Sequence, residues 1–299
     1  MTPSACAGRT LQGIVLMLGL VACSPAPEPA GSSGPVERIV SLAPHLTEMA
    51  YAAGAGDRLV GAVEFSDYPP AARELPRIGD AFRVDYEVLA RLAPDIVLAW
   101  RGGNPPALIG HLRGLGYRVE EFDAASLENL PAQLRRMGEL AGREAQASAA
   151  AARFRDGLAA LEAAYGGAVP VRVFYQVSRE PLFTVTDRQL IGQVIALCGG
   201  LNVFGELREL SPVVGIESVL AAAPDVILVG GPPDQAEASR KDWEQWAALP
   251  AVRQGEIHAV DVDLVSRPGP RLVGGAEQVC ELLDAARRRA GLSPAPSPR

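Results

Sequence analysis

The 299-residue sequence is poor in several features, and each shortage argues against a class of protein. No apolar run approaches the ~20 residues that a membrane-spanning helix requires. The 28 basic residues are outnumbered by 35 acidic ones and form no block, which argues against a nucleic-acid-binding surface. Lys241 is the only lysine. Hydrophobic residues make up 48% of the chain, enough for one large or two medium-sized globular domains.

Motifs of catalysis are also missing. The chain has no Gly-x-Ser-x-Gly turn, no phosphate-binding P-loop and no Cys/His spacing typical of zinc. Two of its three histidines, His111 and His258, are expected to be structural or surface residues. His45 follows the first predicted strand and is a candidate cleft residue, either as a general base or as a ligand to a metal carried by the bound molecule. Because no nucleophile–base pair accompanies it, we predict a protein that is not an enzyme and has no cofactor or metal of its own.

Residues 1–22 are predicted to form a lipoprotein signal peptide. Arg9 is their only charged residue, and a short apolar core follows it. The sequence Leu20-Val21-Ala22-Cys23 is similar to the lipobox of bacterial lipoproteins, so we expect cleavage before Cys23 and lipidation of this residue. The chain would then lie in the periplasm, anchored to a membrane through its lipid. An ordinary cleaved signal peptide is the alternative.

The remaining cysteines and the ends of the chain fit an exported protein. Residues 23–35 are rich in proline, glycine and serine and predict a flexible linker, and 292–299 predict a disordered tail. Cys198 and Cys280 are the two cysteines of the predicted globular part. An even pair in an oxidising compartment favours a disulfide, with two buried free thiols as the alternative.

The body of the chain alternates predicted strands and helices in two sections. Strands are predicted at 38–42, 59–64, 95–100, 119–122, 171–177, 226–229 and 257–260. Such alternation predicts parallel sheets with right-handed crossovers. Thr47 is expected to cap the first helix. We therefore predict an α/β fold with two Rossmann-like lobes at 36–126 and 167–291 and the ligand cleft between them. A single long helix within the connecting helical segment 127–166 is expected to join the lobes.

An internal repeat supports two similar lobes. Residues 87–98 (EVLARLAPDIVL) match residues 217–228 (ESVLAAAPDVIL), 130 positions later. Each copy is predicted to be a helix, a Pro-Asp turn and a buried strand, and Gly-Gly follows soon after. Two copies of a long unit indicate paired lobes rather than a solenoid. Ligands of paired α/β lobes bind in the cleft near the carboxyl ends of the strands.

Aromatic side chains follow several of the predicted strands. Phe65 and Tyr68 come after the second strand, Trp100 ends the third, and Phe183 follows the first strand of the second lobe. Rigid aromatic walls on both lobes suit a large, flat and partly apolar ligand. The pattern therefore favours a binding protein for such a molecule.

These segments together resemble the class III solute-binding proteins of bacterial ABC importers, which carry cobalamin, siderophores and haem. The resemblance rests on 38–44 (RIVSLAP) with Thr47-Glu48, 66–70 (SDYPP), 99–104 (AWRGGN), 181–184 (PLFT), 198–204 (CGGLNVF) and 267–271 (RPGPR). SDYPP and AWRGGN are the most similar to cobalamin-binding members. The resemblance extends from about residue 36 to residue 291 and implies two α/β lobes joined by one rigid helix.

The resemblance also implies a set of ligand-binding residues. The set comprises Phe65, Trp100, Phe183, Asp263 and Arg267, with Pro44 and His45 as further candidates. Where familiar relatives carry pocket tryptophans, this chain has Ala81 and Ser211, so we expect a wider or less aromatic pocket that Phe82 partly fills. Only Arg101 and Arg267 are basic residues expected in the cleft, which favours a near-neutral ligand such as cobalamin or a related corrinoid. A siderophore or haem is the alternative, and an exported enzyme is the second one.

Partners follow from the same resemblance. It implies delivery of the ligand to the permease and ATPase subunits of an ABC importer by a monomeric binding protein. Glu87 and Glu217, which begin the helices of the repeat, match the acids that dock one per lobe into arginine pockets of the transporter. The resemblance further implies that Cys198 and Cys280 are bridged.

Overall fold

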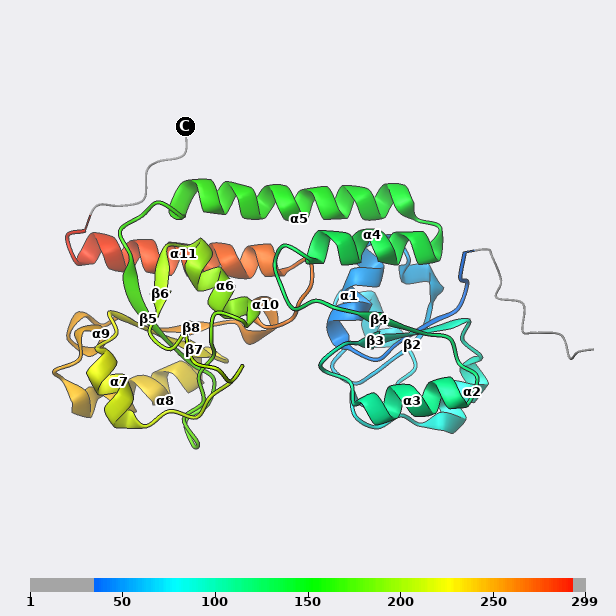
Figure 1. Ribbon diagram of the computed structural model, residues 1–299, viewed down its shortest axis with the longest axis horizontal. Helices are drawn as coiled ribbons and strands as arrows, with labels where there is room; N and C mark the ends of the chain where they lie inside the picture. Colours follow the sequence, from blue (N-terminus) through cyan, green and yellow to red (C-terminus); the bar gives the residue numbers. More distant parts are fainter. Residues whose placement is uncertain (1–34, 293–299) are drawn as a thin grey trace, which may run out of the picture. The chain divides into compact units, whose positions relative to one another are not determined.

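The computed structural model describes residues 35–292. The predicted signal peptide, the lipid site Cys23, the linker up to residue 34 and the tail from residue 293 lie outside the described residues. The described chain forms two four-stranded parallel sheets with helices on both faces (Figure 1). Between residues 35 and 292, no helix is both long enough and apolar enough to cross a membrane. The predicted α/β class with parallel sheets is confirmed.

The first lobe is built on a sheet with the strand order β2-β1-β3-β4. Its elements are β1 (Ile39–Ser41), α1 (Pro44–Ala52), β2 (Leu59–Ala62), α2 (Tyr86–Leu92), β3 (Ile96–Trp100), α3 (Pro106–Gly114) and β4 (Val119–Phe122), with 3₁₀ turns at Gly56–Arg58 and Pro70–Glu74. The central strand β3 is apolar at every position and buried up to Ala99, as expected of a parallel strand covered on both faces. Trp100 therefore emerges at its carboxyl end.

The second lobe repeats this topology with the strand order β6-β5-β7-β8. Its elements are β5 (Val171–Gln176), α6 (Leu190–Leu197), β6 (Gly200–Asn202), α7 (Ile216–Ala222), β7 (Val226–Gly230), α8 (Pro233–Trp243), a 3₁₀ turn at Glu244–Trp246, α9 (Pro250–Gln254), β8 (Ile257–Val260), α10 (Val262–Val265) and α11 (Leu272–Arg289). The strand carboxyl ends of both lobes border the site described below.

Two helices connect the lobes. Gly142, at a φ of 63° that favours glycine, ends α4 (Leu130–Ala141), and α5 (Glu144–Tyr165) follows. Helix α5 packs against α4 and against α11 of the second lobe (Figure 1). Phe154 and Leu158 of α5 belong to one buried apolar cluster that includes residues of both sheets. The two lobes therefore share a core through α5.

Some local predictions were wrong. The first helix begins at Pro44 rather than after Thr47, because the fixed φ of proline suits the first helical position. Thr47 lies inside the helix, and its hydroxyl bonds to Ser66 Oγ at 3.2 Å instead of capping the backbone. The sequence also did not predict β6, α8, α9 or α10. Strand β6 has only three residues and follows α6 almost directly, so no periodic pattern marks it.

The internal repeat has the same hydrogen bonds in both lobes. Asp95 Oδ2 accepts from the backbone N–H of Arg38, and Asp225 Oδ2 accepts from that of Arg172, each at 2.9 Å. The guanidinium of each arginine donates to the last carbonyl of α2 or α7, at 2.6 and 2.7 Å respectively. These bonds fix α2 to the amino ends of β1 and β3, and α7 to the amino ends of β5 and β7. Helices α2 and α7 therefore occupy equivalent places in their lobes.

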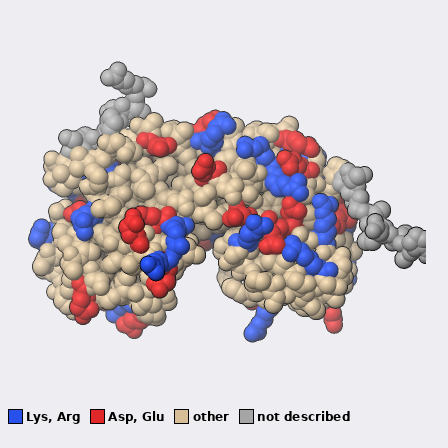
Figure 2. Space-filling view, viewed as in Figure 1, with Lys and Arg blue, Asp and Glu red and all other residues tan. Residues whose placement is uncertain are grey.

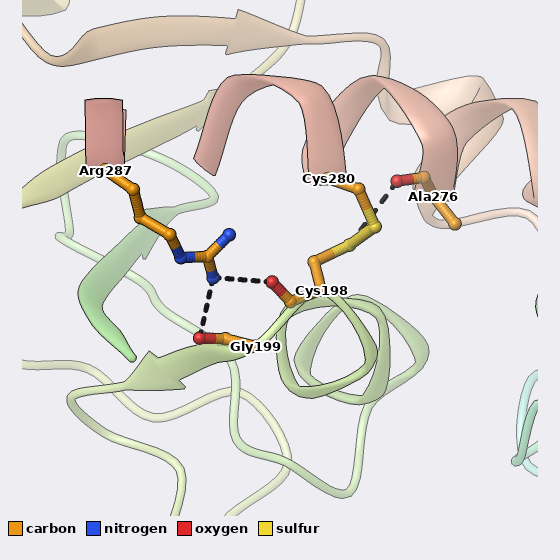
Figure 3. Close-up of a disulfide and its surroundings, with 5 residues drawn as sticks. All are labelled: Cys198, Gly199, Ala276, Cys280 and Arg287. Carbon is orange, nitrogen blue, oxygen red and sulfur yellow. Dashed lines mark hydrogen bonds between the residues drawn. A yellow bond between two sulfur atoms is a disulfide. The ribbon is translucent and has the colours of Figure 1, made fainter. Parts of the chain in front are cut away.

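The predicted disulfide between Cys198 and Cys280 is present. Cys198 follows the last residue of α6, and Cys280 lies within α11; both are fully buried. The buried Arg287 donates to the carbonyls of Cys198 and Gly199 at 2.7 and 2.8 Å (Figure 3). The bridge and this guanidinium together join α6 and the start of β6 to the final helix.

Candidate ligand-binding site

A cavity of about 400 Å³ is lined by residues of both lobes. The first lobe contributes Trp100, Arg101, Gly102, Ala124 and Ala125. The second lobe contributes a mainly apolar wall that includes Tyr175, Val185, Leu190, Ile191 and Leu210. In Figure 2 the surface is hollowed between the lobes, and acidic and basic side chains are mixed on this face. A cavity with walls from two lobes can enclose a ligand from opposite sides.

Trp100 is the aromatic wall of the first lobe. Its backbone N–H donates to Asn104 Oδ1 at 2.6 Å, and Asn104 Nδ2 donates to the carbonyls of Leu42 and Ala81 at 3.1 and 2.8 Å. The indole lies against Gly103, where an added Cβ would come within 1.8 Å of the ring. The turn after β3 therefore fixes the indole before any ligand arrives.

His45 lies behind this wall and does not line the cavity. It belongs to the first turn of α1, is 3% exposed, and packs edge-on against the Trp100 ring with 4.9 Å between centroids. Its Nε2 has no hydrogen-bond partner among the described residues. Burial, reinforced by the charge of Arg267, lowers the pKa of His45 to about 3. The ring is therefore neutral near pH 7 and supports Trp100 as an uncharged aromatic group.

Acidification is expected to destabilise the folded protein through His45. The folded pKa is about 3 and the ordinary value is 6.5, so below pH 6.5 the unfolded chain binds a proton that the folded chain excludes. Stability therefore falls as the pH falls through this range, by about 2 kcal/mol between pH 7 and pH 5. The free energy of unfolding of both proteins is measured with urea at pH 7 and at pH 5. In His45→Phe, which keeps a ring against Trp100, the loss of stability between the two pH values should be smaller by about 2 kcal/mol than in the native protein. Equal pH dependence of the two proteins would contradict the assignment.

A cluster of ion pairs connects the lobes beside the cavity. Glu48 of α1 is 3% exposed and accepts two hydrogen bonds from Arg271, at 2.7 and 2.8 Å. Arg267 lies 3.4 Å from Glu48, 2.8 Å from Asp67 and 3.0 Å from Asp263. The hydrogen bond to Glu48 raises the pKa of Arg271. Both arginines belong to the second lobe, whereas Glu48 and Asp67 belong to the first, so the cluster holds the lobes together.

The structure brings only part of the predicted ligand set to the cavity. Among the described residues, Trp100 is the member that lines it, and Asp263 and Arg267 belong to the ion-pair cluster. Phe65 is 75% exposed after β2, and Phe183 is half-buried in a turn whose backbone pairs with Ser178. Pro44 is the first residue of α1, directly before His45. Contact of these side chains with a ligand remains a prediction.

Sequence reasoning missed most of the second-lobe wall. Tyr175 lies on β5, and burial raises the pKa of its hydroxyl to about 12. Arg188 and Leu210 come from loops before α6 and before α7. Glu48 and Arg271 lie in two of the sequence motifs, but the sequence analysis predicted no role for either residue. A glutamate inside an apolar helix turn was the one available signal, because a buried carboxylate requires a cationic partner.

The two acids predicted to dock a transporter lie at equivalent positions. Glu87 and Glu217 are exposed in the first turns of α2 and α7. Both helices cover the sheet faces that are turned away from α5 (Figure 1). The Asp85 side chain caps α2, whereas α7 follows Gly215 and has no side-chain cap. Between residues 35 and 292, no group of three or more His, Cys, Asp or Glu is arranged to hold a metal ion.

Comparison with known sequences relates the chain to bacterial binding proteins. The model of a periplasmic binding protein family matches residues 39–264. The vitamin B12-binding protein of Vibrio cholerae serotype O1 is 36% identical over 279 residues, 92% of this chain and 100% of the relative. The vitamin B12-binding protein of Pectobacterium carotovorum is 37% identical over 83% of this chain and 89% of the relative.

Solved structures show the same relationship. The periplasmic vitamin B12-binding protein of Vibrio cholerae superposes with a TM-score of 0.78 at 38% identity, over 85% of this chain and 99% of that one. The periplasmic haem-binding protein of Roseiflexus sp. RS-1 gives a TM-score of 0.73 at 26% identity, over the same shares of the two chains. The fold is thus shared by proteins that bind a corrinoid and by proteins that bind haem.

Proposed function

Because the chain belongs to the periplasmic binding protein family, we propose that it captures cobalamin or a related corrinoid and delivers it to an ABC importer. The observation that carries this proposal is the cavity between the lobes, walled by a fixed Trp100, in a chain similar along nearly its whole length to vitamin B12-binding proteins. Lipidation at Cys23 would keep the protein at a membrane, close to the permease. Phe65, Phe183, Asp263, Arg267, Pro44 and His45 complete the proposed site, in contact with the ligand or behind the residues that touch it.

Haem is the second candidate ligand. It is also large, flat and mostly apolar, and the similarity to the haem-binding protein of Roseiflexus supports it. Calorimetric titration of the purified chain with cyanocobalamin, dicyanocobinamide and haemin separates the candidates. We expect binding of a corrinoid at micromolar concentration or below, without turnover. Binding of haemin alone would reject the corrinoid assignment.

Trp100→Ala is expected to weaken binding of cyanocobalamin by about 1–3 kcal/mol, or ~5- to 150-fold, because apolar contact area is lost. Gly103→Ala should act in the same direction, because the added Cβ would displace the indole. Gly110→Ala in α3 is the matched control, since its Cβ meets nothing within 4 Å. Calorimetry on all three variants measures the effect. Unchanged affinity of both Trp100→Ala and Gly103→Ala would show that the indole is not part of the site.

A further inference from the structure

The charged side chains that line the cavity are both arginines. Arg101 follows β3 of the first lobe, and Arg188 lies two residues before α6 of the second. The chain as a whole has a formal charge of −7, so the cavity has the opposite sign. A cationic cavity in an acidic protein attracts an anionic group selectively.

Within the described part of its own lobe, Arg101 has only one long ion pair, to a carboxylate that it shares with Arg113. Its nearest carboxylate belongs to Glu121, whose Oε2 lies 3.8 Å from Arg101 Nε, beyond hydrogen-bond distance. The other oxygen of Glu121 already accepts a hydrogen bond from Arg113 at 2.8 Å. The Arg101 side chain is also 60% exposed. Its guanidinium therefore keeps donors available for a ligand.

Arg188 is equally available. It forms no ion pair with any described residue, and its only hydrogen bond there is through its backbone carbonyl, which accepts from Gln193. Arg267, by contrast, is shared among three carboxylates of the protein. The sequence-based expectation of a near-neutral ligand counted Arg267 and omitted Arg188. In the structure, the charge of Arg267 is balanced by carboxylates of the protein, whereas the charge of Arg188 is not balanced by any described residue. Arg188, rather than Arg267, is therefore the arginine that can bind an anion of the ligand.

We propose that Arg101 and Arg188 hold an anionic group of the bound ligand, one guanidinium from each lobe. The cavity then selects a corrinoid-sized ligand that carries a phosphodiester or a carboxylate. Guanidinium groups bind both anions through charge-assisted, often bidentate hydrogen bonds. Cobalamin has a phosphodiester in its nucleotide arm, haem has two propionates, and cobinamide has neither. This inference rests on the proposed function and specifies its substrate class: complete cobalamin in preference to cobinamide.

The test compares ligands with and without the anion. Arg101→Gln, Arg188→Gln and the double variant are titrated with cyanocobalamin and with dicyanocobinamide, at low and at high salt. Arg155→Gln on α5 is the matched control, because Arg155 is 63% exposed, pairs with the adjacent Asp156 and lies outside the cavity. Thermal unfolding of each variant without ligand confirms that the fold is intact.

We expect the double variant to bind cyanocobalamin about tenfold more weakly at low salt, with about a threefold loss in each single variant. Its affinity for dicyanocobinamide should stay within about twofold of the native value, and the loss for cyanocobalamin should shrink at high salt. Arg155→Gln should change neither affinity. Equal losses for both corrinoids, or no loss for cyanocobalamin, would overturn the proposal.

Failure of the proposed function gives a different result. If the native protein binds haemin and no corrinoid, the corrinoid assignment fails. The double variant should then bind haemin more weakly but leave haem dimethyl ester unaffected, and that outcome upholds the role of the arginines. Equal binding of haemin by the native and double-variant proteins would overturn it. A native protein that binds none of these ligands would overturn both proposals.

Discussion

Removal of the disulfide is expected to lower the free energy of unfolding by about 4 kcal/mol. Cys198 and Cys280 are 82 positions apart, so the bridge excludes many conformations of the unfolded chain. In the folded state the bridge lies in the apolar cluster that also contains α5. Loss of the bridge therefore gives the unfolded chain more conformations, and it leaves a poorly filled site in the core that the two lobes share.

Guanidinium chloride unfolding of the native protein and of Cys198→Ala with Cys280→Ala measures this effect. The melting temperature should also fall, by roughly 10 °C for a chain of this size. Native protein treated with a reductant provides the matched comparison, because it loses the bridge and keeps both sulfurs. A difference below about 1 kcal/mol between oxidised and reduced protein would show that the bridge adds little to stability.

The fold could be predicted because its signals are local. Buried parallel strands such as β3 are continuous apolar runs in the sequence. The end of α4 is marked by Gly142, because the residue after the helix has a positive φ that glycine adopts most readily. The Pro-Asp turns of the repeat mark the same helix-to-strand junction twice. The start of α1 was predicted wrongly because two local signals competed, and the proline at the first position prevailed over the threonine three residues later.

The site was less predictable because it joins residues far apart in the chain. Trp100 was identified from its place at a strand end, which is again a local signal. Nothing near Arg267 in the sequence shows that Glu48, 219 positions away, comes within 3.4 Å of it. Nor does the sequence around Arg188 show that this residue lines the same cavity as Arg101. Which arginine is compensated and which is free depends on how the lobes pack.

Reversing the charge of both acids at the helix starts, Glu87→Arg with Glu217→Arg, is expected to abolish most transport while ligand affinity stays within about twofold. The repeat places the two carboxylates at equivalent, exposed positions of similar lobes. If the proposed importer is built from two like membrane subunits, it would present a matching pair of sites. Arginines in place of the two glutamates would repel the arginine pockets expected on the transporter and so oppose docking. Each single variant should lose part of the transport activity.

Helix stabilisation is the alternative role for these acids. A carboxylate in the first turn of a helix stabilises it by about 0.3–1 kcal/mol. At Glu87 this contribution is largely redundant, because the Asp85 side chain already accepts from the backbone N–H groups of Glu87 and Val88, at 2.9 and 3.0 Å. At Glu217 the contribution of the carboxylate to helix stability is not redundant, because α7 has no side-chain cap. A purely structural role therefore predicts unequal effects of the two single variants, on unfolding rather than on transport.

Uptake of labelled cobalamin and ligand-stimulated ATP hydrolysis by the reconstituted importer distinguish the two roles. Glu162→Arg with Glu277→Arg, on the exposed surfaces of α5 and α11, is the matched control for net charge. The control should transport normally, whereas the loss in Glu87→Arg with Glu217→Arg should persist at physiological salt. Native docking should weaken as salt increases, because exposed charge pairs are screened. Normal uptake by the double variant would reject docking through these acids, and equal loss of cobalamin binding would show instead that the substitutions disturb the fold.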